Sequence, residues 1–282
     1  MINEDFFMKH ERIYLNPEDD RVYIDTYVRN SGVREGILVV PGGGYGEVCT
    51  DREGEPIALD FFAAGYNAFV LNYRVGRETD RFPFQLLDAA SAMVYIREHS
   101  EELKIDPKRV FAVGFSAGGH LVGSLATMYK YDEVKAAFGE KYKLVRPTGV
   151  ILSYPVTSAN SLTHSNTFMR LLGKPLSEYT DEEKQRYSID SALDGESSPM
   201  FLWHTAGDKT VPVFGTLATA AACANAGVPY QLAVYPYGAH GIALGDEVTA
   251  REGRGDIQPL AAQWRSAARE WFKTLPDSDF EN

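Results

Sequence analysis

Short apolar runs alternate with longer segments of helical periodicity along most of the chain. Alternating apolar and polar side chains at 12–16 and 21–28 predict antiparallel strands at one edge of a sheet. Continuous apolar runs predict strands buried on both faces, at 36–43, 67–73, 106–116, 148–156, 199–208 and 230–240. Helical segments are expected at 55–66, 83–105, 117–130, 213–227 and 258–275. This alternation predicts the α/β class, with a mostly parallel central sheet flanked by helices.

Two stretches interrupt the alternation. Residues 131–147 are charged and fit an excursion before a strand, and residues 157–198 are too long for a plain connection. Long insertions in compact domains often form lids or binding loops, although a surface excursion without a role is the alternative. No repeat or flexible linker divides the chain, so we expect a single domain over 1–282 with a lid-like insertion at about 157–198.

Charge and composition narrow the classes of partner. The net charge of −11 argues against nucleic acid and against a polyanionic substrate, although a local basic pocket would override the total. No apolar run approaches the ~18–20 residues of a membrane span, and residues 1–15 lack the basic start of a secretory signal. We therefore expect a cytoplasmic protein, with a homo-oligomer left open. Cys49 and Cys223 lie far apart in the sequence and are expected to be buried free thiols.

A cluster of small residues follows the apolar run that ends at Phe115. Gly114-Phe115-Ser116-Ala117-Gly118 matches G-x-S-x-G, between an expected strand and an expected helix. Glycines keep Cβ atoms out of such a tight turn, and the serine hydroxyl then projects at the carboxyl end of the sheet. The pattern predicts a nucleophilic Ser116; a serine-glycine loop that only caps the helix is the alternative.

A serine hydroxyl needs a base to take its proton. Of the six histidines, His240 follows the last expected strand in a loop of small residues. His120 lies four residues beyond Ser116 on the helix and is expected to pack or to support the site. His164 falls in the insertion, where contact with substrate is open but nothing in the sequence fixes the side chain over the serine, and His10 and His99 are expected at the surface. His240 is therefore the predicted base.

A catalytic triad also contains an acid, which accepts a hydrogen bond from the second imidazole nitrogen of the histidine. Asp208 stands at the carboxyl end of the strand expected at 199–208, which gives the order Ser116, Asp208, His240 that α/β-hydrolases use. His204 and Asp208 have the spacing of a helical metal pair, but their segment is expected to be a strand. No metal site is predicted.

The early loop VVPGGGYGEV, residues 39–48, provides backbone amides for an oxyanion. We assign the donors to Gly43 and Gly44, with Ala117 as the third. A phosphate-binding loop is the competing interpretation, but the Gly-Lys-Ser/Thr and G-x-G-x-x-G patterns are both absent.

The segments VPGGGYGEV, VGFSAGGHLVGSLAT and PMFLWHTAGDKTVP, with YPYGAHGIAL, resemble the α/β-hydrolase esterases. The resemblance is nearest to bacterial acetyl-xylan esterases and bifunctional feruloyl/acetyl carbohydrate esterases, which are related to the hormone-sensitive-lipase-like enzymes. It covers about residues 22–275 and is weakest in the two interrupting stretches. It implies a Ser-Asp-His serine esterase without a cofactor, acting on a small ester such as an acetylated sugar or xylo-oligosaccharide. Tyr45, beside the glycines, is expected either to contact substrate or to pack.

Two other functions remain open from the sequence. A serine peptidase of the prolyl-oligopeptidase type uses the same triad, but this chain has no room for the large N-terminal propeller of those enzymes. The second alternative function is a binding protein that has the hydrolase fold but no catalytic activity. All of the expected catalytic positions are filled here, which favours the enzyme.

Overall fold

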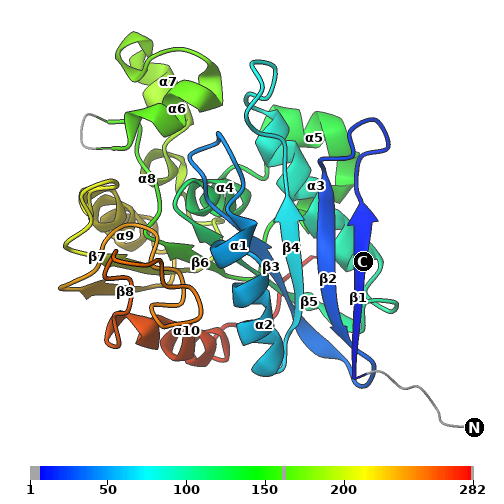
Figure 1. Ribbon diagram of the computed structural model, residues 1–282. Coiled ribbons are helices and arrows are strands. Elements are labelled where there is room, and N and C mark those ends of the chain that lie inside the picture. The colour runs from blue at the N-terminus through cyan, green and yellow to red at the C-terminus, as the bar shows by residue number, and fades with distance from the viewer. Residues whose placement is uncertain (1–6, 161–162, 281–282) are drawn as a thin grey trace, which may run out of the picture.

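A mostly parallel sheet forms the centre of the structure, a computed structural model that describes residues 7–160 and 163–280 (Figure 1). Within those residues the sheet has eight strands in the order β1-β2-β4-β3-β5-β6-β7-β8. The strands are β1 (Met8–Tyr14), β2 (Tyr23–Arg29), β3 (Arg34–Val40), β4 (Asn67–Asn72), β5 (Ile105–Phe115), β6 (Val150–Ser153), β7 (Met200–Thr205) and β8 (Tyr230–Tyr235). β2 is antiparallel to both of its neighbours, and the strands from β4 to β8 are parallel.

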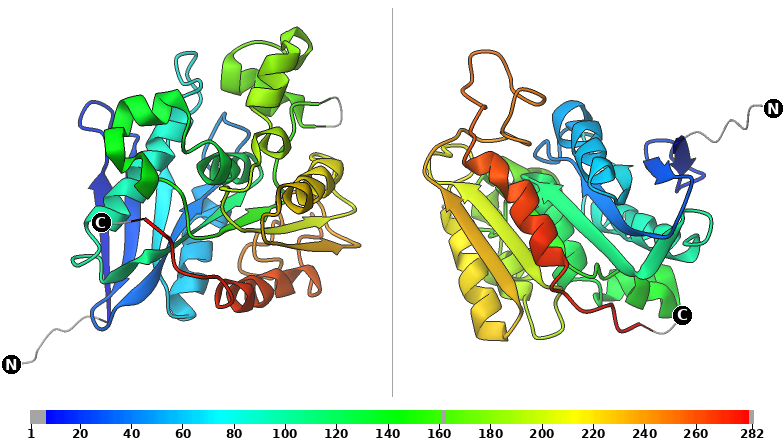
Figure 2. Two further views of the ribbon diagram at one scale, coloured as in Figure 1. Left: turned by 180° about the vertical axis from the view of Figure 1, so that it is seen from behind. Right: turned by 90° about the horizontal axis from the view of Figure 1, so that it is seen from below.

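Helices cover both faces of this sheet (Figure 2). One face carries α2 (Glu55–Ala63) and α10 (Trp264–Phe272), whose Phe61 and Trp264 enter a core rich in aromatic side chains. The other face carries α3 (Phe84–Glu98), α4 (Ala117–Thr127) and α9 (Phe214–Ala226), with α5 (Asp132–Phe138) packed on α3. The central parallel strands β3, β4, β6 and β7 are mostly buried and apolar, which is the pattern that predicted them. The first part of β5 is polar, and the edge strand β8 is partly exposed.

The elements expected from the sequence are present, with differences at their ends. The helix expected over 83–105 ends at Glu98, because the chain turns at Lys104 (φ 51°) and Ile105 already pairs with Arg34 of β3. The expected C-terminal helix begins later, since a 3₁₀ turn at Ala261–Gln263 precedes α10. The edge strand β1 runs from Met8 to Tyr14 rather than over 12–16, because its whole length pairs with β2.

The insertion lies above the carboxyl ends of the parallel strands (Figure 1). Its described part contains α6 (Ser165–Leu172), a 3₁₀ turn at Leu176–Glu178, α7 (Asp181–Arg186) and α8 (Ile189–Ala192). Residues 131–147 form α5 and a 3₁₀ segment at Gly139–Leu144, while α1 (Thr50–Glu53) follows the early glycine loop. Over 7–160 and 163–280, no helix is long and apolar enough to cross a membrane.

Candidate active site

Ser116 occupies the sharp turn between β5 and α4. Its φ of 53° and ψ of −116° are a strained conformation for a residue with a side chain. The turn is held by its own backbone, because Ser116 donates its N–H to Ser153 and its carbonyl accepts from Val156. Ser116 is buried apart from 8% of its surface, so the hydroxyl is presented at a fixed place.

The glycines around Ser116 are required by close packing. A Cβ on Gly118 would lie 2.2 Å from the carbonyl oxygen of Val40, and one on Gly114 would lie 2.2 Å from the carbonyl oxygen of Gly118. Real Cβ atoms do not come this close to backbone oxygens. The elbow therefore rests directly on the strand that leads into the early glycine loop.

The three side chains expected to form a triad meet in one hydrogen-bonded line. His240 Nε2 lies 2.8 Å from Ser116 Oγ, and His240 Nδ1 lies 2.6 Å from Asp208 Oδ2. Because Nδ1 donates to the carboxylate, Nε2 of the neutral ring is free to accept the serine proton. This is the arrangement that a nucleophile with a general base requires.

Asp208 is held as a carboxylate by donors from all sides. Burial by itself raises the pKa of this group, but hydrogen bonds from His204 and His240 outweigh burial and hold the pKa well below its usual range. The amides of Thr210 and Val211 donate to the other oxygen, Oδ1, at 2.9 Å each. Asp208 therefore stays ionised opposite the imidazole of His240.

His204 is a functional contact that the sequence analysis did not assign. It is fully buried, and its Nε2 lies 2.9 Å from the carbonyl of Val211 and 3.2 Å from Asp208 Oδ2. Both of these atoms are acceptors, so Nε2 carries the proton, and Nδ1 accepts from the Thr216 hydroxyl at 2.7 Å. The His204–Asp208 spacing that resembled a metal pair is thus a second hydrogen bond to the acid.

The loop that carries His240 is fastened by an arginine. Arg251 donates from Nη2 to the carbonyls of His240 and Gly241, at 2.8 and 3.0 Å. The buried carboxylate of Asp256 pairs with Arg251 Nε at 2.6 Å. This pair fixes the backbone on both sides of the imidazole.

The early glycine loop packs against the elbow, and a buried glutamate holds it there. Glu53, 2% exposed, accepts from the Gly42 amide at 2.8 Å and from the Tyr154 hydroxyl at 2.9 Å. The Tyr154 ring packs edge-on against His240 at 5.1 Å. Glu53 thus links the glycine loop to Tyr154, the residue that packs against the imidazole of His240.

Gly43 and Gly44 differ from Gly42 in their amides. The Gly42 N–H is used by Glu53, whereas those of Gly43 and Gly44 donate to no acceptor within the part of the chain that the structure describes. Ala117 is the first residue of α4, so its N–H has no partner within that helix. None of the three amides predicted as oxyanion donors thus has a backbone acceptor in the described residues, and Gly43 and Gly44, but not the buried Ala117, line the pocket at Ser116.

The side chain of Tyr45 is packed, which is one of the two roles expected for it. Its side chain is 2% exposed, and its hydroxyl lies 2.8 Å from Nδ1 of His120. His120 Nε2 donates to the Tyr187 carbonyl, so Nδ1 accepts from Tyr45, and burial lowers the pKa of His120 to about 4. Tyr45 therefore packs, and it ties the glycine loop to α4 and, through His120, to the insertion. Its contact with substrate stays a prediction.

A small pocket opens over the serine. Its volume is about 170 Å³, and Ser116, His240, Gly43 and Gly44 line it. The insertion adds His164 and Arg170, and the pKa of His164 is lowered by burial and by the nearby His240 and Arg170. His164 therefore lies where the sequence placed a substrate contact, within reach of a group bound at Ser116.

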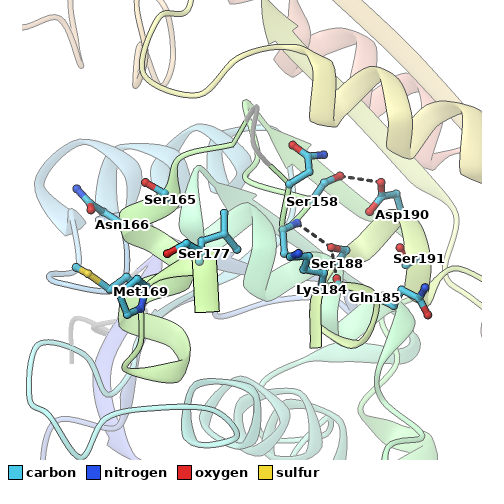
Figure 3. Close-up of a pocket in the computed structure, with 14 residues that line it drawn as sticks. Ser158, Ser165, Asn166, Met169, Ser177, Lys184, Gln185, Ser188, Asp190 and Ser191 are labelled. Carbon is cyan, nitrogen blue, oxygen red and sulfur yellow. Dashed lines mark hydrogen bonds between the residues drawn. The ribbon is translucent and has the colours of Figure 1, made fainter. Parts of the chain in front are cut away.

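A larger cavity of about 840 Å³ lies within the insertion and does not include the triad (Figure 3). Serine, asparagine and other polar side chains from α6, α7 and α8 line it, together with Met169 and Leu176. In Figure 3, Ser158 donates to Asp190 on one side of this cavity. The cavity therefore belongs to the insertion and is separate from the small pocket at Ser116.

We searched the described residues for side chains that could bind a metal ion. No group of three or more His, Cys, Asp or Glu side chains there is arranged to hold a metal ion. Cys49 and Cys223 are both buried and free, as expected. Burial raises the pKa of Cys49, which lines the small pocket, to about 11, so its thiol stays protonated.

Residues 23–219 match the BD-FAE family. The chain belongs to this family of α/β-hydrolase esterases. The match confirms the resemblance to α/β-hydrolase esterases that the sequence indicated.

Two solved structures are similar over almost the whole chain. The acetyl ester-xyloside bifunctional hydrolase of Caldicellulosiruptor lactoaceticus is 29% identical with a TM-score of 0.80, covering 95% of this chain and 97% of that one. MGS-M1, an α/β hydrolase from a Medee basin deep-sea metagenome library, is 30% identical with a TM-score of 0.75, covering 94% and 97%.

Curated relatives are longer proteins. The acetylxylan esterase of Xylanibacter ruminicola is 30% identical over 83% of this chain and 47% of its own length. Endo-1,4-beta-xylanase B of Butyrivibrio fibrisolvens is 36% identical over 79% of this chain and 35% of its own length. The chain thus matches about a third to a half of each of these relatives.

Proposed function

We propose that this BD-FAE family member is a serine carboxylesterase that removes short acyl groups, acetyl above all, from sugars or xylo-oligosaccharides. The observation that carries the proposal is the line Ser116–His240–Asp208 ending beside three free amides. The small volume of about 170 Å³ at the serine favours a short acyl group. Relatives described as an acetylxylan esterase and an acetyl ester-xyloside hydrolase support the sugar as the alcohol.

The chemistry takes two steps with the same residues. His240 Nε2 accepts the Ser116 proton as Oγ attacks the ester carbonyl, and the amides of Gly43, Gly44 and Ala117 stabilise the oxyanion. His240 then returns the proton to the leaving alcohol, which gives the acyl-enzyme. Water, deprotonated by the same nitrogen, releases the acid, while Asp208 stabilises the imidazolium in both steps.

Hydrolysis of a series of esters tests the proposal. We would compare p-nitrophenyl acetate, butyrate and octanoate with a feruloyl ester and an acetylated xylo-oligosaccharide. Ser116→Ala is expected to lower kcat/KM by about 10⁴-fold or more, because the remaining groups no longer act on a nucleophile. The matched control is Ser124→Ala, a buried serine on α4 whose hydroxyl donates to the His120 carbonyl.

The acetate should be the best substrate, and acetate should be released from the oligosaccharide. A preference for octanoate would contradict the short-acyl assignment and leave the serine mechanism standing. Equal activity in Ser116→Ala and the unmodified protein would contradict the triad itself.

A further inference from the structure

A hollow beside the glycine loop is not used by the mechanism above. It has a volume of about 390 Å³, and three segments form it: Tyr45–Gly46, the loop from Gly76 to Arg81, and the end of α6 from Met169 to Gly173. Arg170 lines both this hollow and the small pocket at Ser116. The hollow therefore lies next to the position of a substrate held at the serine, on the side of the glycine loop.

Three arginines face this hollow: Arg77, Arg81 and Arg170. None of them forms an ion pair with any carboxylate in the described residues, although the chain carries a net charge of −11. The neighbouring arginines behave differently, since Arg21 pairs with Asp80 and Arg74 pairs with Asp88.

The hollow also contains two acids. Asp80 is buried, and its carboxylate is already bound by Arg21 and by the backbone amide of Arg77. Glu78 is exposed and forms no ion pair with another described residue. Three unpaired guanidinium groups thus face a single unpaired carboxylate, and the hollow carries an excess of positive charge.

Glycines make room for two of the guanidinium groups. A Cβ on Gly173 would lie 1.9 Å from Cζ of Arg81, and one on Gly46 would lie 2.9 Å from Cζ of Arg170. Each guanidinium therefore lies directly against bare backbone. Arg170 also donates from Nη1 to the Gly44 carbonyl at 3.1 Å, which joins the hollow to the loop proposed to hold the oxyanion.

We propose that this arginine hollow binds an anionic group carried by the alcohol half of the substrate, so that the preferred ester is an acylated sugar with a carboxylate or a phosphate. Guanidinium groups bind such oxygens through paired, charge-assisted hydrogen bonds that a neutral hydroxyl cannot replace. The acyl group enters the small pocket at Ser116, and the sugar extends past Arg170 toward Arg77 and Arg81. The inference rests on the proposed esterase function.

Three matched esters test the inference. They are the same mono-acetylated methyl glycoside with a hydroxymethyl group, a carboxylate or a phosphate ester at C6. We expect kcat/KM for one of the anionic esters to exceed that of the neutral ester by about tenfold, the effect of one charged hydrogen bond. The carboxylate and phosphate arms identify which anion the hollow accepts.

The double variant Arg77→Gln/Arg81→Gln is expected to abolish that preference through a higher KM for the anionic ester. Arg81→Lys should retain part of it, because charge remains while the planar fork is lost. Arg254→Gln is the matched control, since Arg254 is exposed, unpaired among the described residues and outside the hollow. Equal kcat/KM for the three esters, or an equal loss on all of them in the double variant, would overturn the inference.

Calorimetry separates failure of this inference from failure of the esterase proposal. Ser116→Ala is titrated with methyl glucuronoside and with glucose 6-phosphate, which contain no ester. Binding that is weakened about tenfold by the double arginine substitution supports the hollow even if no ester is hydrolysed. Serine-dependent hydrolysis of p-nitrophenyl acetate without any binding of either anion would sustain the esterase and reject the hollow.

Discussion

Asp208 in the candidate active site is a buried carboxylate and Asp190 in the insertion is a half-buried one, and their surroundings differ. Asp208 accepts from two histidines and two backbone amides, which hold its pKa well below the usual range although burial opposes this. Asp190 accepts a side-chain hydrogen bond from Ser158 on one oxygen, while its Oδ1 is buried without a partner, and burial raises its pKa. The environment of Asp208, the proposed acid of the triad, therefore favours the charged form, whereas the environment of Asp190 in the insertion disfavours it.

The backbone shows the same contrast. The elbow brings Gly118 against the carbonyls of Val40 and Pro41, so that the contact between the start of α4 and the end of β3 depends on one small residue. Gly195, at the end of the insertion, has one neighbour near a would-be Cβ, the Ala226 carbonyl at 3.6 Å. Close packing thus fixes the backbone beside Ser116, whereas the backbone at Gly195 has room for a side chain.

Alanine at the two glycines gives the largest expected difference. Gly118→Ala places a Cβ 2.2 Å from Val40 O and 2.4 Å from Pro41 O, so the elbow or β3 must shift. We expect a loss of about 3 kcal/mol or more in unfolding free energy and loss of esterase activity. Gly195→Ala should change stability by less than about 0.5 kcal/mol. Urea unfolding and p-nitrophenyl acetate hydrolysis measure both, and similar results for the two variants would remove the contrast.

Site residues that belong to local sequence patterns could be predicted, and those that meet only in the folded chain could not. The elbow and the glycine loop are local patterns at strand ends, so Ser116, Gly43 and Gly44 could be assigned from the sequence alone. Asp208 and His240 follow late strands in a known order, which the sequence also displays. Their catalytic roles stay predictions until the variants are measured.

The supporting residues could not be predicted in the same way. Glu53 meets Tyr154 across 101 residues of sequence, and Arg170 reaches Gly44 across 126. Such contacts arise only when the sheet and the insertion assemble. The direction of the Tyr45 side chain could not be predicted for another reason. An aromatic residue after glycines has the same sequence pattern whether it points into a pocket or into the core.

His204 allows a finer test of the active-site network. His204→Leu removes one donor from Asp208 Oδ2, so more of the negative charge faces His240 and its protonated form is favoured. The acid limb of the kcat/KM profile should move to higher pH. His204→Gln, which keeps an N–H donor, should restore the original limb, and kcat/KM is measured from pH 5 to 9.

The corresponding change in the insertion is Ser158→Ala, which removes the hydroxyl donor of Asp190. It should leave the pH profile of kcat/KM unmoved, because Asp190 is not in the hydrogen-bonded line to Ser116. An identical shift for His204→Leu and Ser158→Ala would mean that the profile reports general loosening of the fold. An unmoved limb in His204→Leu would reduce His204 to a packing role.

The smallest expected effect is at Asp190 itself. Its pKa is raised in the folded protein, so the folded state keeps a proton to higher pH than the unfolded chain, and stability falls as pH rises through that window. Asp190→Asn removes the buried charge and should raise the melting temperature at pH 7 by about 1–2 °C. The gain should shrink toward pH 4, where the aspartic acid is itself becoming neutral.

Asp208→Asn should have the opposite sign at pH 7, because the lowered pKa of Asp208 contributes stability that is present above the unfolded-state pKa. Thermal unfolding of both variants at pH 4 and pH 7 checks the pair, and a loss of stability in Asp190→Asn at pH 7 would show that the insertion depends on this carboxylate after all.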